Sequence, residues 1–338
     1  MLENQMAYLF TKDLELGYYR SDGELHILQK SVNEKLMEGD MVCLIGANGS
    51  GKSTLIRTLA GMQKPLKGKV YVGTDEIHQL TNARRSRLMS IVLTNNTTAG
   101  NMTVAEIVAL GRYSYTNWLA KLEQTDKIKI LDSLKKVGLE TFQKRKLNTL
   151  SDGEKQRVFI AKGLASEAPV MLLDEPTAHL DIPNKVNILS LLRRLTREYN
   201  RSVLVATHEL ELALKLADEV WLLMPDQTIF RSTPEELVSS GRLDQVFGNE
   251  LLSFNAHSGN FTLNSKSLGS VSVTGEGALA DLSVQAFRRI GYTTDTYTVS
   301  NSVRVHIKGK HWILGHKGER IESDTLAETC RLLRKIGK

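Results

Sequence analysis

The residues best suited to phosphate chemistry stand close together near the start of the chain. Residues 46–54 read Gly-Ala-Asn-Gly-Ser-Gly-Lys-Ser-Thr, and the glycines allow backbone N–H groups to turn toward phosphate oxygens. Lys52 would reach the β- and γ-phosphates of a nucleotide, and the hydroxyl of Ser53 would ligate Mg²⁺. The predicted nucleotide-binding residues of this phosphate loop are Gly46, Asn48, Gly49, Ser50, Gly51, Lys52, Ser53 and Thr54.

Two apolar runs further along the chain end in residues that suit hydrolysis. Residues 170–173 read Val-Met-Leu-Leu, which is typical of a strand buried on both faces, and Asp174 and Glu175 follow. Asp174 is placed to hold Mg²⁺ through water, and Glu175 is placed to orient or deprotonate an attacking water. After the second run, residues 203–206, His208 is placed to contact the γ-phosphate. We therefore predict Glu175 and His208 as the catalytic residues.

A third segment, residues 150–154, reads Leu-Ser-Asp-Gly-Glu and lies about twenty residues before the acidic strand. Ser151 and Glu154 have the spacing of a capping box, which predicts a helix over residues 154–165. A serine hydroxyl, a glycine N–H and a helix N-terminus also form an anion site, so the two interpretations are compatible. We expect the carboxylates of Asp152 and Glu154 to point outward or to pair with Lys155 or Arg157.

In this order and spacing, the three segments resemble those of ATPase subunits of ABC transporters, and the resemblance covers residues 5–240. In that family the segment at 150–154, here called the signature segment, caps the nucleotide held by a second subunit. The resemblance implies ATP and Mg²⁺ as ligands and a second copy of the chain as partner. It adds Ser151, Gly153 and Glu154 to the nucleotide site, and Tyr18 as the aromatic that stacks on adenine.

One stretch of the chain resembles a particular subgroup of this family, and another stretch departs from the family pattern. The segment from Thr94 to Trp118, which contains residues 103–113, resembles the subgroup that imports ferric siderophores, haem and vitamin B12, although Ser114 stands where that subgroup often has proline. Where the family places a glutamine that touches Mg²⁺ and water, this chain has Thr94, whose hydroxyl is a shorter ligand, and Asn95 could substitute for it. The predicted metal ligands are therefore Ser53, Thr94 and Asp174.

The elements that must position these residues alternate between strands and helices. We predict an α/β fold, with a P-loop NTPase core built on a mostly parallel sheet and a helical subdomain over about residues 93–165. The predicted ATPase domain spans residues 1–256, and a small α+β domain spans residues 257–338. The elements predicted in that smaller domain are strands 261–264, 270–274, 303–307 and 311–314 and helices 277–290 and 323–336. It would regulate, dimerise or dock.

Composition limits the class of protein and its partners. No apolar run approaches the length needed to span a bilayer, and two cysteines, Cys43 and Cys330, provide no disulfide framework. Residues 257–338 hold 12 Lys/Arg against 7 Asp/Glu, whereas the remainder holds 32 against 31. The basic excess therefore belongs to the smaller domain. No basic-aromatic motif supports nucleic acid as a partner.

Together these features predict an ATPase that powers a membrane importer, for iron-siderophore, haem or cobalamin. It would sit peripherally on the cytoplasmic face of the inner or plasma membrane, beneath permease subunits and, indirectly, a periplasmic or lipid-anchored binding protein. Two alternatives remain open at this point. One is an ABC efflux ATPase, since no residue dictates the direction of transport, and the other is a soluble ABC protein without a transport role.

Overall fold

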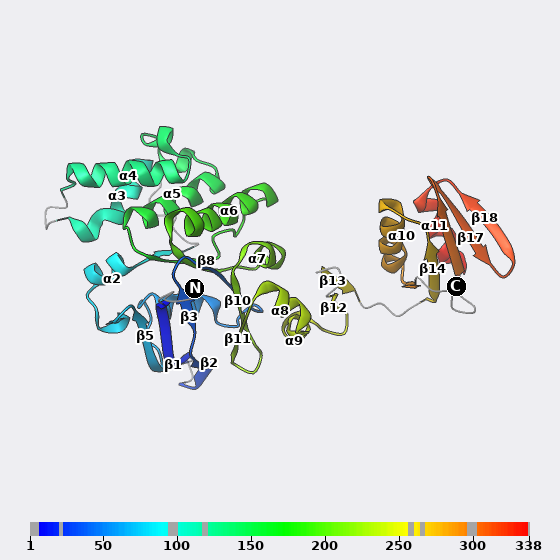
Figure 1. Ribbon diagram of the computed structural model, residues 1–338, viewed down its shortest axis with the longest axis horizontal. Helices are drawn as coiled ribbons and strands as arrows, with labels where there is room; N and C mark the ends of the chain where they lie inside the picture. The colour runs from blue at the N-terminus through cyan, green and yellow to red at the C-terminus, as the bar shows by residue number, and fades with distance from the viewer. Residues whose placement is uncertain are drawn as a thin grey trace, which may run out of the picture. The chain divides into compact units, whose positions relative to one another are not determined.

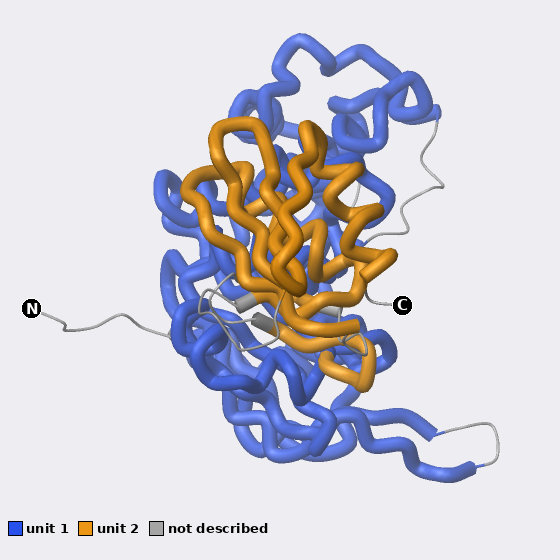
Figure 2. The backbone as a smooth tube through the Cα atoms, turned by 90° about the vertical axis from the view of Figure 1, so that its right-hand side faces the viewer, with its two compact units in different colours: residues 1–247, 256–260 blue, residues 248–255, 261–338 orange. Residues whose placement is uncertain are grey.

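In the computed structural model the chain divides into two units. Residues Met1–Phe247 and Ala256–Asn260 form the first, and Gly248–Asn255 and Phe261–Lys338 form the second (Figure 2). The structure describes residues 7–19, 23–93, 101–116, 121–255, 260–263, 268–295 and 303–336. The predicted boundary after residue 256 remains a prediction, because short segments on either side of it cluster with the opposite unit.

A six-stranded sheet forms the centre of the first unit, in the order β11-β10-β4-β9-β8-β7. All neighbours are parallel except β11, which runs antiparallel to β10. Every residue of β4, β8 and β9 is buried, as expected for strands covered on both faces. The mostly parallel sheet of the prediction is confirmed. The strands are β4 (Met41–Ile45), β7 (Met89–Val92), β8 (Val170–Asp174), β9 (Ser202–Ala206), β10 (Glu219–Leu223) and β11 (Ile229–Ser232).

A second, antiparallel sheet lies in the same unit and shares a hydrophobic core with β4, β8 and β10. Its strands are β1 (Ala7–Tyr19), β2 (Leu25–Val32), β3 (Lys35–Met37), β5 (Lys67–Val72) and β6 (Asp75–Glu76). The helices outside the helical subdomain are α1 (Lys52–Leu59), η1 (Ile77–Gln79), α2 (Asn82–Leu88), α6 (Ile182–Tyr199), α7 (Leu210–Leu216), α8 (Pro234–Ser239) and α9 (Arg242–Phe247).

The helical subdomain lies between β7 and β8 in the chain. Helices α3, α4 and α5 lie side by side in Figure 1, and all three pairs are in contact. Its elements are α3 (Val104–Ala109), η3 (Leu110–Tyr115), α4 (Gln124–Lys136), η4 (Glu140–Phe142), η5 (Leu147–Thr149) and α5 (Asp152–Ala165). The signature helix thus begins at Asp152 rather than at residue 154, because the side chain of Ser151 caps it.

The second unit is an α+β fold built on a sheet in the order β15-β14-β16-β17-β18. Its final helix begins at Leu326, not at residue 323 as predicted, because Ser323 still pairs with Trp312 across β17 and β18. The prediction also missed β12, β15 and β18. The elements are β12 (Leu252–Asn255), β13 (Asn260–Leu263), β14 (Ser270–Thr274), α10 (Ala278–Arg289), β15 (Thr293–Asp295), β16 (Val303–Lys308), β17 (His311–His316), β18 (Glu319–Ser323) and α11 (Leu326–Ile336).

Over the described residues, none of these helices combines the length and the apolar character that a membrane span requires.

Candidate functional site

The phosphate loop connects the carboxyl end of β4 to the start of α1. Gly49 and Gly51 have φ angles of 77° and 101°, in the left-handed region that favours glycine. At Gly46 a Cβ atom would lie 2.6 Å from the Oγ of Ser50 and 2.9 Å from the Cβ of Leu223. Larger residues at these positions would therefore distort the backbone of the loop.

Lys52 is held inside this loop. Its ammonium group donates to the carbonyl oxygens of Gly46, at 2.9 Å, and of Ala47, at 3.1 Å, and the residue is only 5% exposed. Burial lowers the pKa of Lys52, and the negative charges of Glu175 and Asp174 oppose that shift. A buried cation with three donors, held against the loop by two backbone carbonyl oxygens, suits a phosphate group.

Ser53 and Asp174 meet beside the loop. The hydroxyl of Ser53 donates to Oδ1 of Asp174 at 2.9 Å, which joins the first turn of α1 to the carboxyl end of β8. Burial raises the pKa of Asp174, while the hydrogen bond from Ser53 acts in the opposite direction. A hydroxyl and a carboxylate at hydrogen-bonding distance are hard oxygen donors, so these two residues fit Mg²⁺.

Glu175 and His208 are brought together by neighbouring parallel strands. Asp174 pairs with Ala206 across β8 and β9, so the residues just beyond those strands lie at one edge of the sheet. There Oε1 of Glu175 lies 2.7 Å from Nε2 of His208. Glu175 has a φ of 50°, and its N–H donates to the carbonyl of Ala206 at 2.9 Å. This backbone bond fixes Glu175 in a conformation that non-glycine residues seldom adopt.

Lys52, Ser53, Glu175 and His208 line one cavity of about 260 Å³. Three of the site residues predicted in the phosphate loop and at the end of β8 do not line it, namely Gly46, Ser50 and Asp174. Tyr18, which is 46% exposed, lies at this cavity and has its ring centroid 5.3 Å from that of His26. The sequence did not point to Leu28, because a leucine in a strand carries no chemical signal. Its side chain lies 3.1 Å from where a Cβ of Gly51 would be. The lining residues are Tyr18, Leu28, Asn48, Gly49, Gly51, Lys52, Ser53, Thr54, Glu175 and His208.

The signature segment contributes no residue to this cavity. The hydroxyl of Ser151 donates to Oε2 of Glu154 at 2.9 Å, and the same oxygen accepts the N–H of Ser151 at 2.7 Å. The expectation for Glu154 was therefore wrong, since its carboxylate turns back on Ser151 to complete the capping box. Asp152 does pair with Lys155, at 2.9 Å. At Gly153 a Cβ would lie 2.7 Å from Oδ1 of Asn184, so a larger residue there would displace the side chain of Asn184 on α6.

Thr94, the third predicted metal ligand, lies outside the described residues, as does Asn95.

Comparison with known proteins supplies the family. A family model described as "ABC transporter" matches residues 29–178. An uncharacterized ABC transporter ATP-binding protein of Methanocaldococcus jannaschii is 36% identical over 239 residues, which cover 71% of this chain and 81% of that protein. The chain belongs to the ABC transporter ATP-binding family. It is an ABC ATPase, as the order of its three segments predicted.

More specific relatives and a solved structure agree with this assignment. The achromobactin transport ATP-binding protein CbrD of Dickeya dadantii is 33% identical, over 72% of this chain and 88% of that protein. The cobalamin import ATP-binding protein BtuD of Halobacterium salinarum is 33% identical, over 64% of this chain and 54% of that protein. The dimeric ATP-binding cassette MJ0796, bound to ADP and phosphate, has a TM-score of 0.59 and is 29% identical, over 67% of this chain and 98% of that one.

Proposed function

We propose that this ABC ATPase is the energy-supplying subunit of an importer for ferric siderophores, haem or cobalamin. One observation carries the hydrolytic part, namely the convergence of Lys52, Ser53, Glu175 and His208 on a single cavity at the carboxyl ends of three parallel strands. The names of relatives that transport achromobactin or import cobalamin support the choice of substrate class.

In this proposal the chain's own residues bind the triphosphate and activate water. The N–H groups of the phosphate loop and the ammonium group of Lys52 hold the β- and γ-phosphates. Ser53 and Asp174 would hold Mg²⁺, which when bound offsets phosphate charge. Glu175 accepts a proton from the attacking water, and His208 fixes that carboxylate through the 2.7 Å contact while it faces the γ-phosphate.

The site is completed by a second copy of the chain. Ser151, Gly153 and the amino end of α5 would close over the γ-phosphate carried by the partner copy, since hydroxyl and amide donors at a helix N-terminus favour anions. The known dimeric cassette supports this arrangement. ATP binding would close the pair, and hydrolysis would open it again.

The remaining partners follow from the transport role. The helical subdomain would face permease subunits, at the cytoplasmic face of the membrane, and a periplasmic or lipid-anchored binding protein would deliver the substrate to them. We assign residues 1–256 to the ATPase domain and residues 257–338 to an accessory domain, because the phosphate-binding segments all precede residue 210.

The hydrolytic proposal is tested with Glu175→Gln. The variant should bind ATP but lose about two or more orders of magnitude in turnover, since the positioned base is removed. Glu209→Gln is the matched control, because Glu209 is a neighbouring carboxylate that pairs with Lys185 rather than lining the cavity. Near-normal hydrolysis by Glu175→Gln would remove Glu175 from this role.

The transport proposal is tested by uptake. A strain that lacks this chain should fail to take up one of haem, ferric chelates or cobalamin, and the wild-type chain should restore uptake whereas Glu175→Gln should not. Unchanged uptake of all three in the deletion strain would contradict the importer assignment.

A further inference from the structure

A second and larger cavity, of about 550 Å³, lies in the first unit and shares no lining residue with the nucleotide cavity. It is bounded by α2, β7, η3 and the carboxyl-terminal part of α5. Two of its lining side chains, Leu110 and Tyr113, are 50% and 72% exposed. Exposed apolar side chains around a hollow of this size are typical of a surface that another protein covers.

One cation stands among the lining residues without a partner. Lys162, on α5, is half-buried, and its ammonium group makes no hydrogen bond or ion pair within the described part of the chain. Burial lowers the pKa of Lys162, and no neighbouring charge offsets the effect. The hydroxyl of Ser114, also in this cavity, is buried and likewise lacks a hydrogen-bond partner among the described residues. A partly buried cation and a buried hydroxyl are costly to cover with another protein unless that protein pairs with them.

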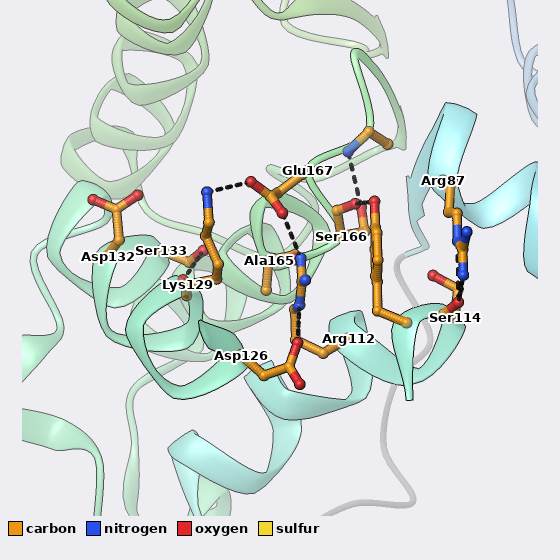
Figure 3. Close-up of polar contacts among 12 residues, drawn as sticks. Arg87, Arg112, Ser114, Asp126, Lys129, Asp132, Ser133, Ala165, Ser166 and Glu167 are labelled. Atoms are coloured by element: carbon orange, nitrogen blue, oxygen red, sulfur yellow. Dashed lines mark hydrogen bonds and ion pairs between the residues drawn. The ribbon is translucent and has the colours of Figure 1, made fainter. Parts of the chain in front are cut away.

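Two acids of the helical subdomain are already engaged with other cations. Glu167, just beyond α5, accepts from Arg112 at 2.8 Å and also pairs with Lys129, and Asp126 accepts from Arg112 at 2.9 Å (Figure 3). Arg112 has a side chain only 6% exposed, so this cluster is fixed within the helical subdomain. Its charges balance one another and leave none for Lys162.

The segments that the structure leaves undescribed near this part of the chain do not supply a counter-charge either. Residues 94–100 read Thr-Asn-Asn-Thr-Thr-Ala-Gly, and residues 117–120 read Asn-Trp-Leu-Ala. Neither holds an aspartate or a glutamate, whatever conformation it adopts. Neither segment therefore offers Lys162 a carboxylate, and a protein that covers this cavity could supply one.

We propose that the cytoplasmic segment of the permease that docks in this cavity places an aspartate or glutamate carboxylate against the ammonium group of Lys162. The inference rests on the proposed function, which supplies the membrane partner. Apolar side chains of the docking segment would cover Leu110 and Tyr113 and exclude water, which strengthens the attraction between the two charges. The carboxylate thus fixes where along the cavity the permease segment binds.

The test uses the permease that co-purifies in stoichiometric amount with the tagged wild-type chain from detergent-solubilised membranes. A carbodiimide joins an amine to a carboxylate in contact with it by an amide bond, with loss of water. Mass spectrometry should identify Lys162 joined to an aspartate or glutamate of a cytoplasmic permease loop. Joining of Lys162 to no permease residue, in a complex that stays intact, would overturn the inference.

Three variants of the same residue separate charge from shape. Lys162→Arg keeps the charge but cannot form the amide, so the cross-link should vanish while association stays within about twofold of wild type. Lys162→Glu should reduce co-purified permease at least about tenfold, and Lys162→Met about fivefold, as for loss of a desolvated charge pair. The amount of co-purified permease is divided by the amount of each variant that still binds ATP, so that misfolded molecules are not counted. Lys127→Glu, an exposed position on α4, is the matched control and should leave association unchanged.

The outcomes distinguish this inference from the proposed function. If the wild-type chain captures no permease at all, the transport role fails and the inference fails with it. If the wild-type chain and all Lys162 variants capture the permease equally, the transport role stands and the carboxylate contact is wrong.

Discussion

The two regions that would together bind ATP differ in how far their polar groups are already arranged for a phosphate. Lys52 lines the nucleotide cavity, and Asp174 accepts a hydrogen bond from Ser53 of the same cavity. Both residues are only 5% exposed, and burial already shifts the pKa of each. The signature segment is open to solvent at Ser151, and its hydroxyl is satisfied locally by Glu154. The first region is preorganised for a phosphate, whereas in the proposed pair the second would exchange an internal hydrogen bond for one to a partner's nucleotide.

The largest effect should come from the preorganised region. Lys52→Met removes the buried ammonium while keeping most of the side chain's volume. Hydrogen bonds to charged groups contribute about 1.5–3 kcal/mol each, so affinity for ATP should fall about 100-fold or more. Titration with a fluorescent ATP analogue measures it, with thermal unfolding as the control for folding. Affinity within about threefold of wild type would show that the loop amides alone bind the phosphates.

A different pattern should follow from Ser151→Ala. ATP binding to a single chain at low protein concentration should stay within about twofold of wild type, because Ser151 does not line that chain's own cavity. Hydrolysis at high protein concentration should fall about tenfold, since a donor to the γ-phosphate is lost from the closed pair. Loss of the cap should also destabilise α5 by about 1 kcal/mol. A loss of ATP affinity in the dilute single chain would contradict the division between the two regions.

The smallest effects should be on stability, with opposite sign in the two regions. The pKa of Asp174 is raised by burial, so its ionisation costs stability as pH rises above about 4, and Asp174→Asn should be more stable than wild type at pH 7. The pKa of Glu154 is lowered, first by the hydrogen bond from the N–H of Ser151, so its contribution is present at pH 7 and is lost as pH falls through that lowered pKa.

Glu154→Gln should therefore be slightly less stable than wild type at pH 7, and both differences should shrink as pH falls toward 4. Urea unfolding of the ATP-free chains between pH 4 and pH 7 checks both signs. Two variants that shift in the same direction at pH 7 would contradict the contrast.

Sequence reasoning reached the residues whose function depends on short spacings. The phosphate loop needs glycines at fixed intervals, and Asp174 and Glu175 follow a run of apolar residues, so both can be recognised locally. Leu28 could not be found this way, because its place beneath Gly51 is set by the packing of β2 against the loop. The start of α11 was misplaced for a similar reason, since only pairing with Trp312 keeps Ser323 in a strand. Glu154 was misjudged because two hydrogen bonds with Ser151 outweigh a more distant cation.

Gly111 has a consequence for how force would pass through this molecule. A Cβ at this position would lie 2.1 Å from the carbonyl oxygen of Lys162, so η3 rests directly on the backbone of α5 with no side chain between them. No side chain separates the two elements at this point, so a displacement of η3 would shift α5 as a rod. Ser151 lies at the other end of that rod, roughly 16 Å away at 1.5 Å per residue. In the proposed complex, this close contact at Gly111 would carry movement of the permease to the nucleotide of the partner copy.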